Sequence, residues 1–267
     1  MIVVENLHKS FDNAEVLKGV SFRVERGETL ALIGRSGYGK SVLLKHIAGL
    51  IQPDDGRVLV DDKDIFHIRE KELLALRNRM GFLFQSGALF DSMTIFENIA
   101  FPLNEKTNLN KKEIKEKVFY ELEQVGLLGS EDKYPSQVSG GMVKRASLAR
   151  ALIEKPGIML FDEPTTGLDP LTGHSILRLI NSRRQMVNFT GIIITHQIPQ
   201  VFDIVDKIAM LHKGVIIAMG TPDEIKASED PTVSQFISCE TGEPFKEFEK
   251  ESDIVRRVRR MKEVHIK

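Results

Sequence analysis

Apolar runs rich in aliphatic residues recur along the chain, and helix-like stretches separate them. One run covers residues 29–33, another covers 158–161 and a third covers 192–195. Between such runs, apolar positions recur every three or four residues, which is typical of amphipathic helices. Strands that alternate with helices pack as a mainly parallel sheet covered by those helices. The pattern therefore predicts an α/β fold.

The first 60 residues depart from this alternation. They read as several short strands, with polar turns at Asp12-Asn13 and at residues 54–56. Strands joined by short turns pair antiparallel. We therefore expect a small antiparallel β layer at the start of the chain.

Strand patterns are absent between residues 91 and 155. Asn110 and Glu113 form a capping pair at the start of a predicted helix, which Gly126 ends. A second helix is predicted over residues 141–154, before Pro156. This part of the chain is expected to be an inserted helical subdomain.

Composition limits the class of protein. The chain has 267 residues, 42% of them hydrophobic, which is enough for a full core. Its formal net charge of −1 argues against nucleic acid as a partner, and its single cysteine, Cys239, fits a reducing compartment. The start of the chain lacks the pattern of a signal peptide, and no apolar run approaches the ~20 residues of a membrane span. We therefore expect a cytoplasmic protein that reaches a membrane only through a partner.

A phosphate-binding pattern follows the first apolar run. Residues 34–41 fit G-x-x-x-x-G-K-[ST], and a helix-like stretch over 42–50 comes next. In such a loop, backbone N–H groups converge on phosphates, the helix start adds a positive dipole, and the lysine adds a point charge. The predicted nucleotide-binding residues are Gly34, Arg35, Ser36, Gly37, Tyr38, Gly39, Lys40, Ser41 and Val42.

Two carboxylates end the second apolar run. Asp162 is expected to hold Mg²⁺ together with the hydroxyl of Ser41, because this cation prefers oxygen ligands. Glu163 is expected to polarise a water molecule and take its proton. The pair indicates nucleotide hydrolysis.

Further motifs occur in a fixed order around these carboxylates. Gln85 follows an apolar run, Ser139-Gly140-Gly141 precedes the carboxylates, Asp169 follows them, and His196 ends the third run. Together with the phosphate loop, this order resembles the ATP-binding cassette (ABC) ATPases to about residue 237.

The resemblance implies a role for each of these motifs. Ser139, Gly140 and Gly141 would be the signature loop that contacts ATP, and Asp169 would link two nucleotide sites. Gln85 would help to place Mg²⁺ and the water, while His196 and Lys40 would stabilise charge on the transferred phosphoryl group. Phe11 stands where the family places an aromatic that stacks on adenine, although an aromatic there is also common in a core.

The resemblance also implies the architecture. The fold would be that of a P-loop NTPase, with a mainly parallel core sheet, a small antiparallel β layer and an inserted helical subdomain. Residues 1–90 and 156–238 would form the nucleotide-binding core with the β layer. Residues 91–155 would form the helical signature subdomain, and residues 239–267 a C-terminal extension.

The number of cassettes predicts the oligomer. In this family the signature loop of one subunit faces the phosphate loop of another. Because the chain has one cassette and no internal repeat, we expect a head-to-tail dimer with a second copy of itself. Ser139 and Gly141 would then close over ATP held by Lys40 of the partner.

Two features narrow the family. Met142 stands where most cassettes have Gln, and both it and the stretch over residues 85–103 are similar to the ATPases of Mla-type transporters. This implies phospholipid transport between bacterial membranes, an integral membrane permease, an MCE-type lipid-binding partner, and a peripheral location at the cytoplasmic face of the inner membrane. An ATPase subunit for another solute is the alternative, and a non-transport cassette is a weaker one.

The sequence does not settle the role of three further features. Ala88, Leu89, Phe90 and Phe101 could form a groove for a helix of the permease or could be core positions. Tyr38 is bulkier than the small residue usual in such loops. Residues 254–261 combine apolar positions at helical spacing with four arginines, which fits a helix that docks on a partner, a helix that lies on anionic lipid, or a solvated terminal helix.

Overall fold

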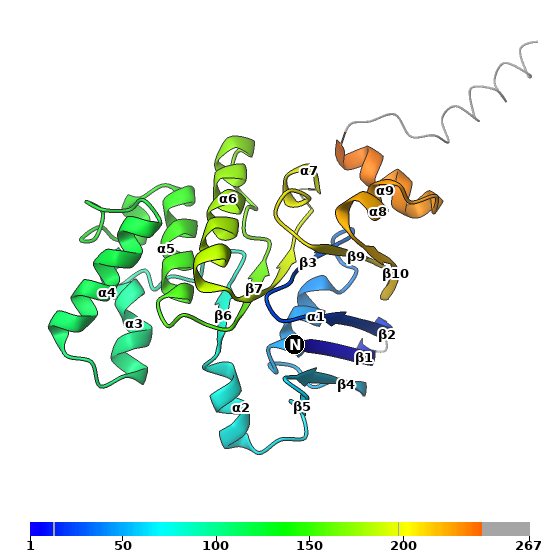
Figure 1. The fold of residues 1–267 in the computed structure, drawn as a ribbon, viewed down its shortest axis with the longest axis horizontal. Helices are drawn as coiled ribbons and strands as arrows, with labels where there is room; N and C mark the ends of the chain where they lie inside the picture. The colour runs from blue at the N-terminus through cyan, green and yellow to red at the C-terminus, as the bar shows by residue number, and fades with distance from the viewer. Residues whose placement is uncertain (13, 197, 242–267) are drawn as a thin grey trace, which may run out of the picture.

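Two β-sheets with helices around them make up the computed structural model of the chain, which describes residues 1–12, 14–196 and 198–241 (Figure 1). The core sheet has the order β10-β9-β3-β8-β7-β6. All neighbours in it are parallel except β10, which pairs antiparallel with β9. The predicted mainly parallel sheet is confirmed. Its strands are β3 (Thr29–Ile33), β6 (Met80–Leu83), β7 (Ile158–Asp162), β8 (Thr190–Ile194), β9 (Lys207–His212) and β10 (Val215–Gly220).

The predicted antiparallel layer is present as a second sheet of order β2-β1-β4-β5. Its first two strands are long rather than short, because bulges let β1 and β2 bend while they stay paired. Asn6 and Gly19 lie at these irregularities with φ angles of 47° and 81°. The strands are β1 (Ile2–Phe11), β2 (Ala14–Val24), β4 (Asp55–Val60) and β5 (Lys63–Asp64).

Alternate residues of β3 belong to two separate cores. Leu30 and Leu32 pack in a cluster with the antiparallel layer and α1 (Lys40–Ile47), whereas Ala31 and Ile33 pack on the opposite face of the sheet. The second cluster includes α6 (Pro170–Val187) and α7 (Ile198–Val201). The core sheet is therefore covered on both faces, which explains why its central strands are apolar throughout.

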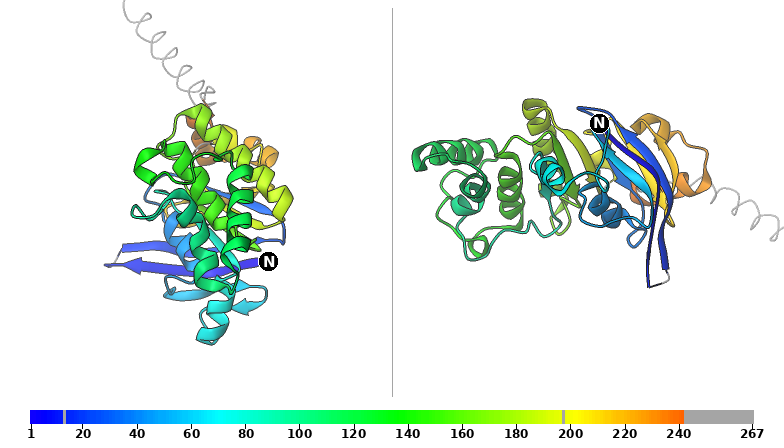
Figure 2. Two further views of the ribbon diagram at one scale, coloured as in Figure 1. Left: turned by 90° about the vertical axis from the view of Figure 1, so that its left-hand side faces the viewer. Right: turned by 90° about the horizontal axis from the view of Figure 1, so that it is seen from below.

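The helical subdomain has a core of its own. Its elements are α3 (Ile95–Lys106), α4 (Lys111–Gln124), the 3₁₀ turn η1 (Pro135–Gln137) and α5 (Gly140–Leu152). Asn110 and Glu113 form the predicted capping box of α4, and Gly126 adopts a φ of 67° just after the helix. Helix α5 begins at Gly140, one residue earlier than predicted, because Ser139 caps its start, and it ends at Leu152 rather than at 154. Figure 2 shows this subdomain at one end of the molecule, with β1 and β2 toward the other.

The remaining helices are α2 (Glu70–Arg77), α8 (Pro222–Lys226) and α9 (Pro231–Thr241). Helix α9 continues past the predicted boundary at residue 238, and the apolar and basic positions predicted for residues 254–261 lie outside the described residues. Among the described helices, none has both the length and the apolar content required to cross a bilayer.

Candidate functional site

The phosphate loop joins β3 to α1, and its glycines are required by the backbone. Gly34, Gly37 and Gly39 have φ angles of 139°, 84° and 98°, which disfavour any side chain. A Cβ at Gly34 would lie 2.2 Å from the carbonyl oxygen of Leu211 in β9. A Cβ at Gly39 would lie 2.9 Å from Cγ1 of Val16 in β2. The loop is thus seated tightly between two strands.

The loop forms one wall of a pocket of about 430 Å³. The predicted residues Gln85 and Glu163 come to the same pocket from β6 and β7, although they are far from the loop in sequence. Val16 also lines it and carried no sequence signal. The other lining residues are Ser36, Gly37, Gly39, Lys40, Ser41 and Val42.

Lys40 supplies a buried positive charge to this pocket. Its Nζ donates hydrogen bonds to the carbonyl oxygens of Gly34, at 2.6 Å, and Arg35, at 3.0 Å. Burial lowers the pKa of the Lys40 ammonium, while the charges of Glu163 and Asp162 act to raise it. The ammonium is therefore held in place by the loop itself.

Ser41 and Asp162 place two oxygen ligands side by side. Ser41 Oγ donates to Asp162 Oδ1 at 2.9 Å. Burial raises the pKa of the Asp162 carboxyl, and the hydrogen bond from Ser41 opposes this shift. The described residues contain no group of three or more His, Cys, Asp or Glu side chains arranged for a metal. A hydroxyl and a carboxylate fit Mg²⁺, which takes its remaining ligands from phosphates and water.

Glu163 is oriented by two neighbours. Its Oε2 accepts a hydrogen bond from Thr166 Oγ1 at 2.6 Å and lies 3.0 Å from His196 Nδ1. Its backbone has a φ of 49°, a conformation that a non-glycine residue adopts only when its surroundings enforce it. The predicted base and the predicted histidine are thus brought together. Thr166 was not anticipated, because its position depends on the turn after β7.

The signature loop lies away from the pocket of its own chain. Ser139 caps α5 by accepting from Met142 N at 3.3 Å, and neither Ser139 nor Gly140 lines the pocket. Asp169 caps α6 by accepting from Leu171 N and Thr172 N. Helices α5 and α6 start side by side, since a Cβ on Gly141 would lie 2.7 Å from Thr172 Cγ2. The chain therefore presents Asp169 and the signature loop as one surface.

The structure shows what Tyr38, Met142 and Phe11 contact. The Tyr38 ring meets the His212 ring edge-on at 5.1 Å, so it packs against the end of β9. Met142 packs against the core of the helical subdomain. Phe11 ends β1, is 41% exposed, and has Lys9 Nζ 5.4 Å from its ring centroid; it does not line the pocket. Its stacking role stays a prediction.

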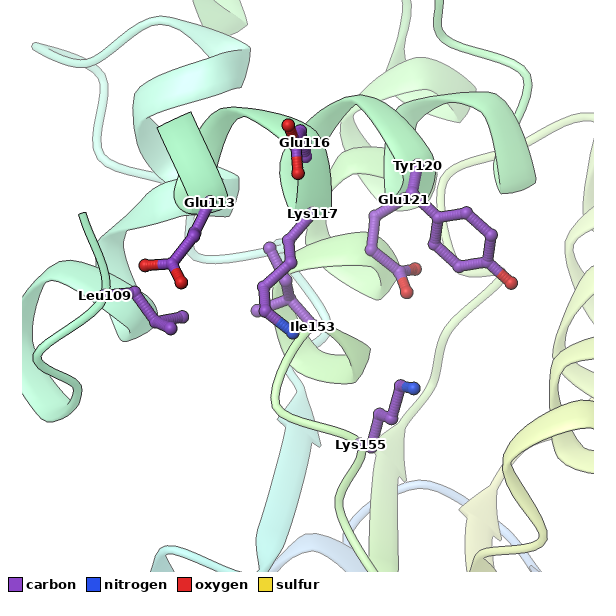
Figure 3. A pocket seen from close by; sticks show the side chains of 8 residues that line it. All are labelled: Leu109, Glu113, Glu116, Lys117, Tyr120, Glu121, Ile153 and Lys155. Atoms are coloured by element: carbon purple, nitrogen blue, oxygen red, sulfur yellow. The ribbon is translucent and has the colours of Figure 1, made fainter. Parts of the chain in front are cut away.

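Another pocket, of about 410 Å³, lies between α4 and the end of α5 (Figure 3). Its side chains carry both signs of charge, and it contains none of the predicted site residues. Its lining is Leu109, Glu113, Glu116, Lys117, Tyr120, Glu121, Ile153 and Lys155.

Known proteins match this chain over most of its length. The profile of the family described as "ABC transporter" matches residues 17–166. The intermembrane phospholipid transport system ATP-binding protein MlaF of Haemophilus influenzae is 39% identical over 91% of this chain and 92% of its own length. The probable ribonucleotide transport ATP-binding protein mkl of Mycobacterium leprae is 40% identical over 89% of this chain and 68% of its own length.

The fold also matches that of solved ATP-binding cassettes. A solved ATP-binding cassette, a dimer in a post-hydrolysis state bound to ADP and Pi, matches with a TM-score of 0.76 and 29% identity. The match covers 83% of this chain and 99% of that one.

Proposed function

Because the chain belongs to the ABC transporter family, we propose that it is the ATP-hydrolysing subunit of a transporter that moves phospholipid between membranes. The observation that carries this proposal is its 39% identity to MlaF over 91% of the chain. In support, Lys40, Ser41, Gln85 and Glu163 line one pocket, and Asp162 and His196 contact Ser41 and Glu163, an arrangement that a purely regulatory cassette would not require.

The pocket suits hydrolysis of ATP. Lys40 and the N–H groups of the loop bind the phosphates, and Ser41 with Asp162 would hold Mg²⁺, with Gln85 at the pocket edge. When bound there, the cation supplies positive charge to the phosphate oxygens. Glu163 takes a proton from the water that attacks the γ-phosphorus, and the bond to the ADP oxygen breaks. His196 and Lys40 stabilise the charge on the transferred group.

A second copy completes the site. Ser139 and Gly141 lie away from Lys40 of their own chain, and the solved relative described above is a dimer. In a head-to-tail pair the signature loop of each copy would cover the ATP of the other. Asp169 lies beside that loop, which suits its predicted role as a link between the two sites.

The transporter partner would dock near the segment that follows Gln85. The Phe90 ring is 43% exposed and lies 4.9 Å from the Phe101 ring, while Leu89 packs on the helical core. Asn98 is fully buried and holds both the N–H and the carbonyl of Phe90. A rigid loop with exposed apolar side chains fits a helix of an integral membrane permease. An MCE-type lipid-binding partner and a location at the cytoplasmic face of the inner membrane follow from the same proposal.

The test is transport by the assembled complex. The chain is reconstituted in liposomes with its permease and MCE-type partner, and transfer of labelled phospholipid is followed with and without ATP. Lys40→Ala is the inactive control, and Phe90→Asp is expected to keep nucleotide binding but abolish transfer. Phospholipid movement that is independent of ATP would overturn the proposal.

The similarity to the mkl protein makes ribonucleotide transport the second candidate, since the identity is equally high over 89% of this chain. The same liposomes, loaded with labelled ribonucleotide, distinguish the two. ATP-dependent movement of ribonucleotide without movement of phospholipid would favour this candidate.

A further inference from the structure

Lys144 is a buried cation to which neither the motifs nor the proposed mechanism assigns a role. It lies in α5, shortly after the signature loop, and is only 5% exposed. Its Nζ donates a hydrogen bond to the backbone carbonyl of Gln85. The charges of Glu163 and Asp162 act to raise the pKa of its ammonium, against the lowering effect of burial. The Lys144 ammonium thus contacts the segment that carries Gln85.

The segment after β6 is fastened along the same side of α5. Arg150 NH2 donates to the carbonyl of Gly87 at 3.1 Å, and a Cβ on Gly87 would lie 2.7 Å from Ser147 Oγ. Positions 144, 147 and 150 are three residues apart, so they share one helix face. Two cations of α5 therefore hold this segment: Lys144 binds the Gln85 carbonyl, and Arg150 binds the Gly87 carbonyl.

We propose that Lys144 is a positioning residue that ties the Gln85 backbone to α5, so that the placement of Gln85 at the pocket follows the signature helix. This inference rests on the proposed ATPase function and adds a residue to it. A movement of α5 that accompanies closure of the signature loop on a partner's ATP would then move Gln85 directly.

The hydrogen bond from Lys144 is the link that the variants remove. An apolar side chain of similar length would leave the Gln85 carbonyl without this donor.

The experiment compares variants of the full chain in its assembled complex. Hydrogen–deuterium exchange of the nucleotide-free protein reports on residues 84–90, and ATPase assays give kcat and KM for ATP. Lys144→Met is expected to speed exchange in this segment and to lower kcat by about tenfold or more, with KM within about threefold, because the phosphate loop is unchanged. Lys144→Arg is expected to restore most of both.

The matched control is Lys106→Met. Lys106 lies in the same subdomain and pairs with Glu154 at the surface, at 2.7 Å. The Lys106→Met variant is expected to show the parental rate of hydrogen–deuterium exchange at residues 84–90 and the parental kcat. Parental exchange and kcat in Lys144→Met would overturn the proposal.

A second variant without a donor keeps the proposal testable where Lys144→Met does not fold. Lys144→Ala with the parental melting temperature and about tenfold lower kcat supports the proposal, and a parental kcat overturns it. A parent complex that hydrolyses no ATP would instead contradict the proposed function, while the exchange data would still decide the Lys144 contact.

Discussion

At the scale of single residues, Glu163 is the proposed catalytic base. Its carboxylate accepts a hydrogen bond from Thr166, lies 3.0 Å from His196 Nδ1, and lines the pocket. Glu163→Gln is expected to bind ATP normally but to lose on the order of 10²-fold of turnover, because a positioned base is removed. Calorimetry of ATP binding and ATPase assays of the full transporter measure the two effects. Wild-type turnover in this variant would remove Glu163 from its role.

His46 in α1 makes the stability of the chain depend on pH. Its side chain is fully buried and its Nδ1 lies 2.7 Å from the carbonyl oxygen of Val42. Burial lowers the pKa of the His46 ring, so the folded state keeps it neutral where the unfolded chain already binds a proton. The free energy of unfolding should therefore fall as the pH drops below about 6.5. Urea unfolding at several pH values measures this loss.

His46→Gln is the matched variant for that experiment, since it removes the titrating ring. Its free energy of unfolding should fall less between neutral and mildly acidic pH than that of the parent. Equal losses in both proteins would show that other groups carry the dependence.

Residues inside short local motifs could be predicted from the sequence, and residues defined by tertiary contacts could not. Lys40, Ser41 and Asp162 carry a pattern that the chemistry of phosphate binding requires, and all lie together as expected. Lys144 carries no such pattern, because its role depends on α5 packing beside the segment after β6. The same holds for the contact of Tyr38 with His212.

At the scale of elements, helices α5 and α6 meet through Gly141. A Cβ there would lie 2.7 Å from Thr172 Cγ2, whereas a Cβ on Gly140 would be 3.5 Å from Leu168 Cδ2, an ordinary contact. Gly141→Ala is therefore expected to be less stable than Gly140→Ala by about 1–3 kcal/mol, because the added methyl group overpacks the contact. Chemical denaturation of the two variants measures the difference. Equal stability would mean that Thr172 moves aside without cost.

A buried ion pair joins α4 to α6. Arg183 NH2 donates to both oxygens of Glu121, at 2.7 and 2.6 Å, and the side chains are 2% and 3% exposed. Arg183→Met is expected to cost about 3–5 kcal/mol of stability, because it leaves a buried carboxylate without its partner. The double variant Glu121→Leu/Arg183→Met should have a free energy of unfolding far closer to that of the parent, as measured by chemical denaturation. A single variant as stable as the double one would contradict this account.

Element boundaries followed the sequence where a capping residue or a glycine marks them. Asn110 with Glu113, and Gly126, set the two ends of α4 as predicted. The length of β1 and β2 could not be predicted, because bulges at Asn6 and Gly19 continue strands that the local pattern reads as broken. Asp230 and Pro231 mark the start of α9 in the sequence, and Asp230 Oδ1 accepts from Thr232 N and Val233 N there.

At the scale of the whole molecule, the proposed ATP site needs a second copy of the chain. The pocket holds Lys40, Gln85 and Glu163, but Ser139 lies on a separate surface with Asp169. A dimer could be expected from the family resemblance and the single cassette. The surface that joins Asp169 to the signature loop could not, because it depends on the contact of α5 with α6.

Complementation between two inactive variants tests the shared site most directly. Lys40→Ala and Ser139→Ala chains are assembled separately and as an equal mixture, and the ATPase rate of each sample is measured. A mixed dimer has one doubly damaged site and one intact site, so random mixing should give about a quarter of the intact sites of the wild type. The account predicts an ATPase rate in the mixture well above that of either variant alone. A mixture no more active than its separate components would contradict it, because each chain would then need its own Ser139 with its own Lys40.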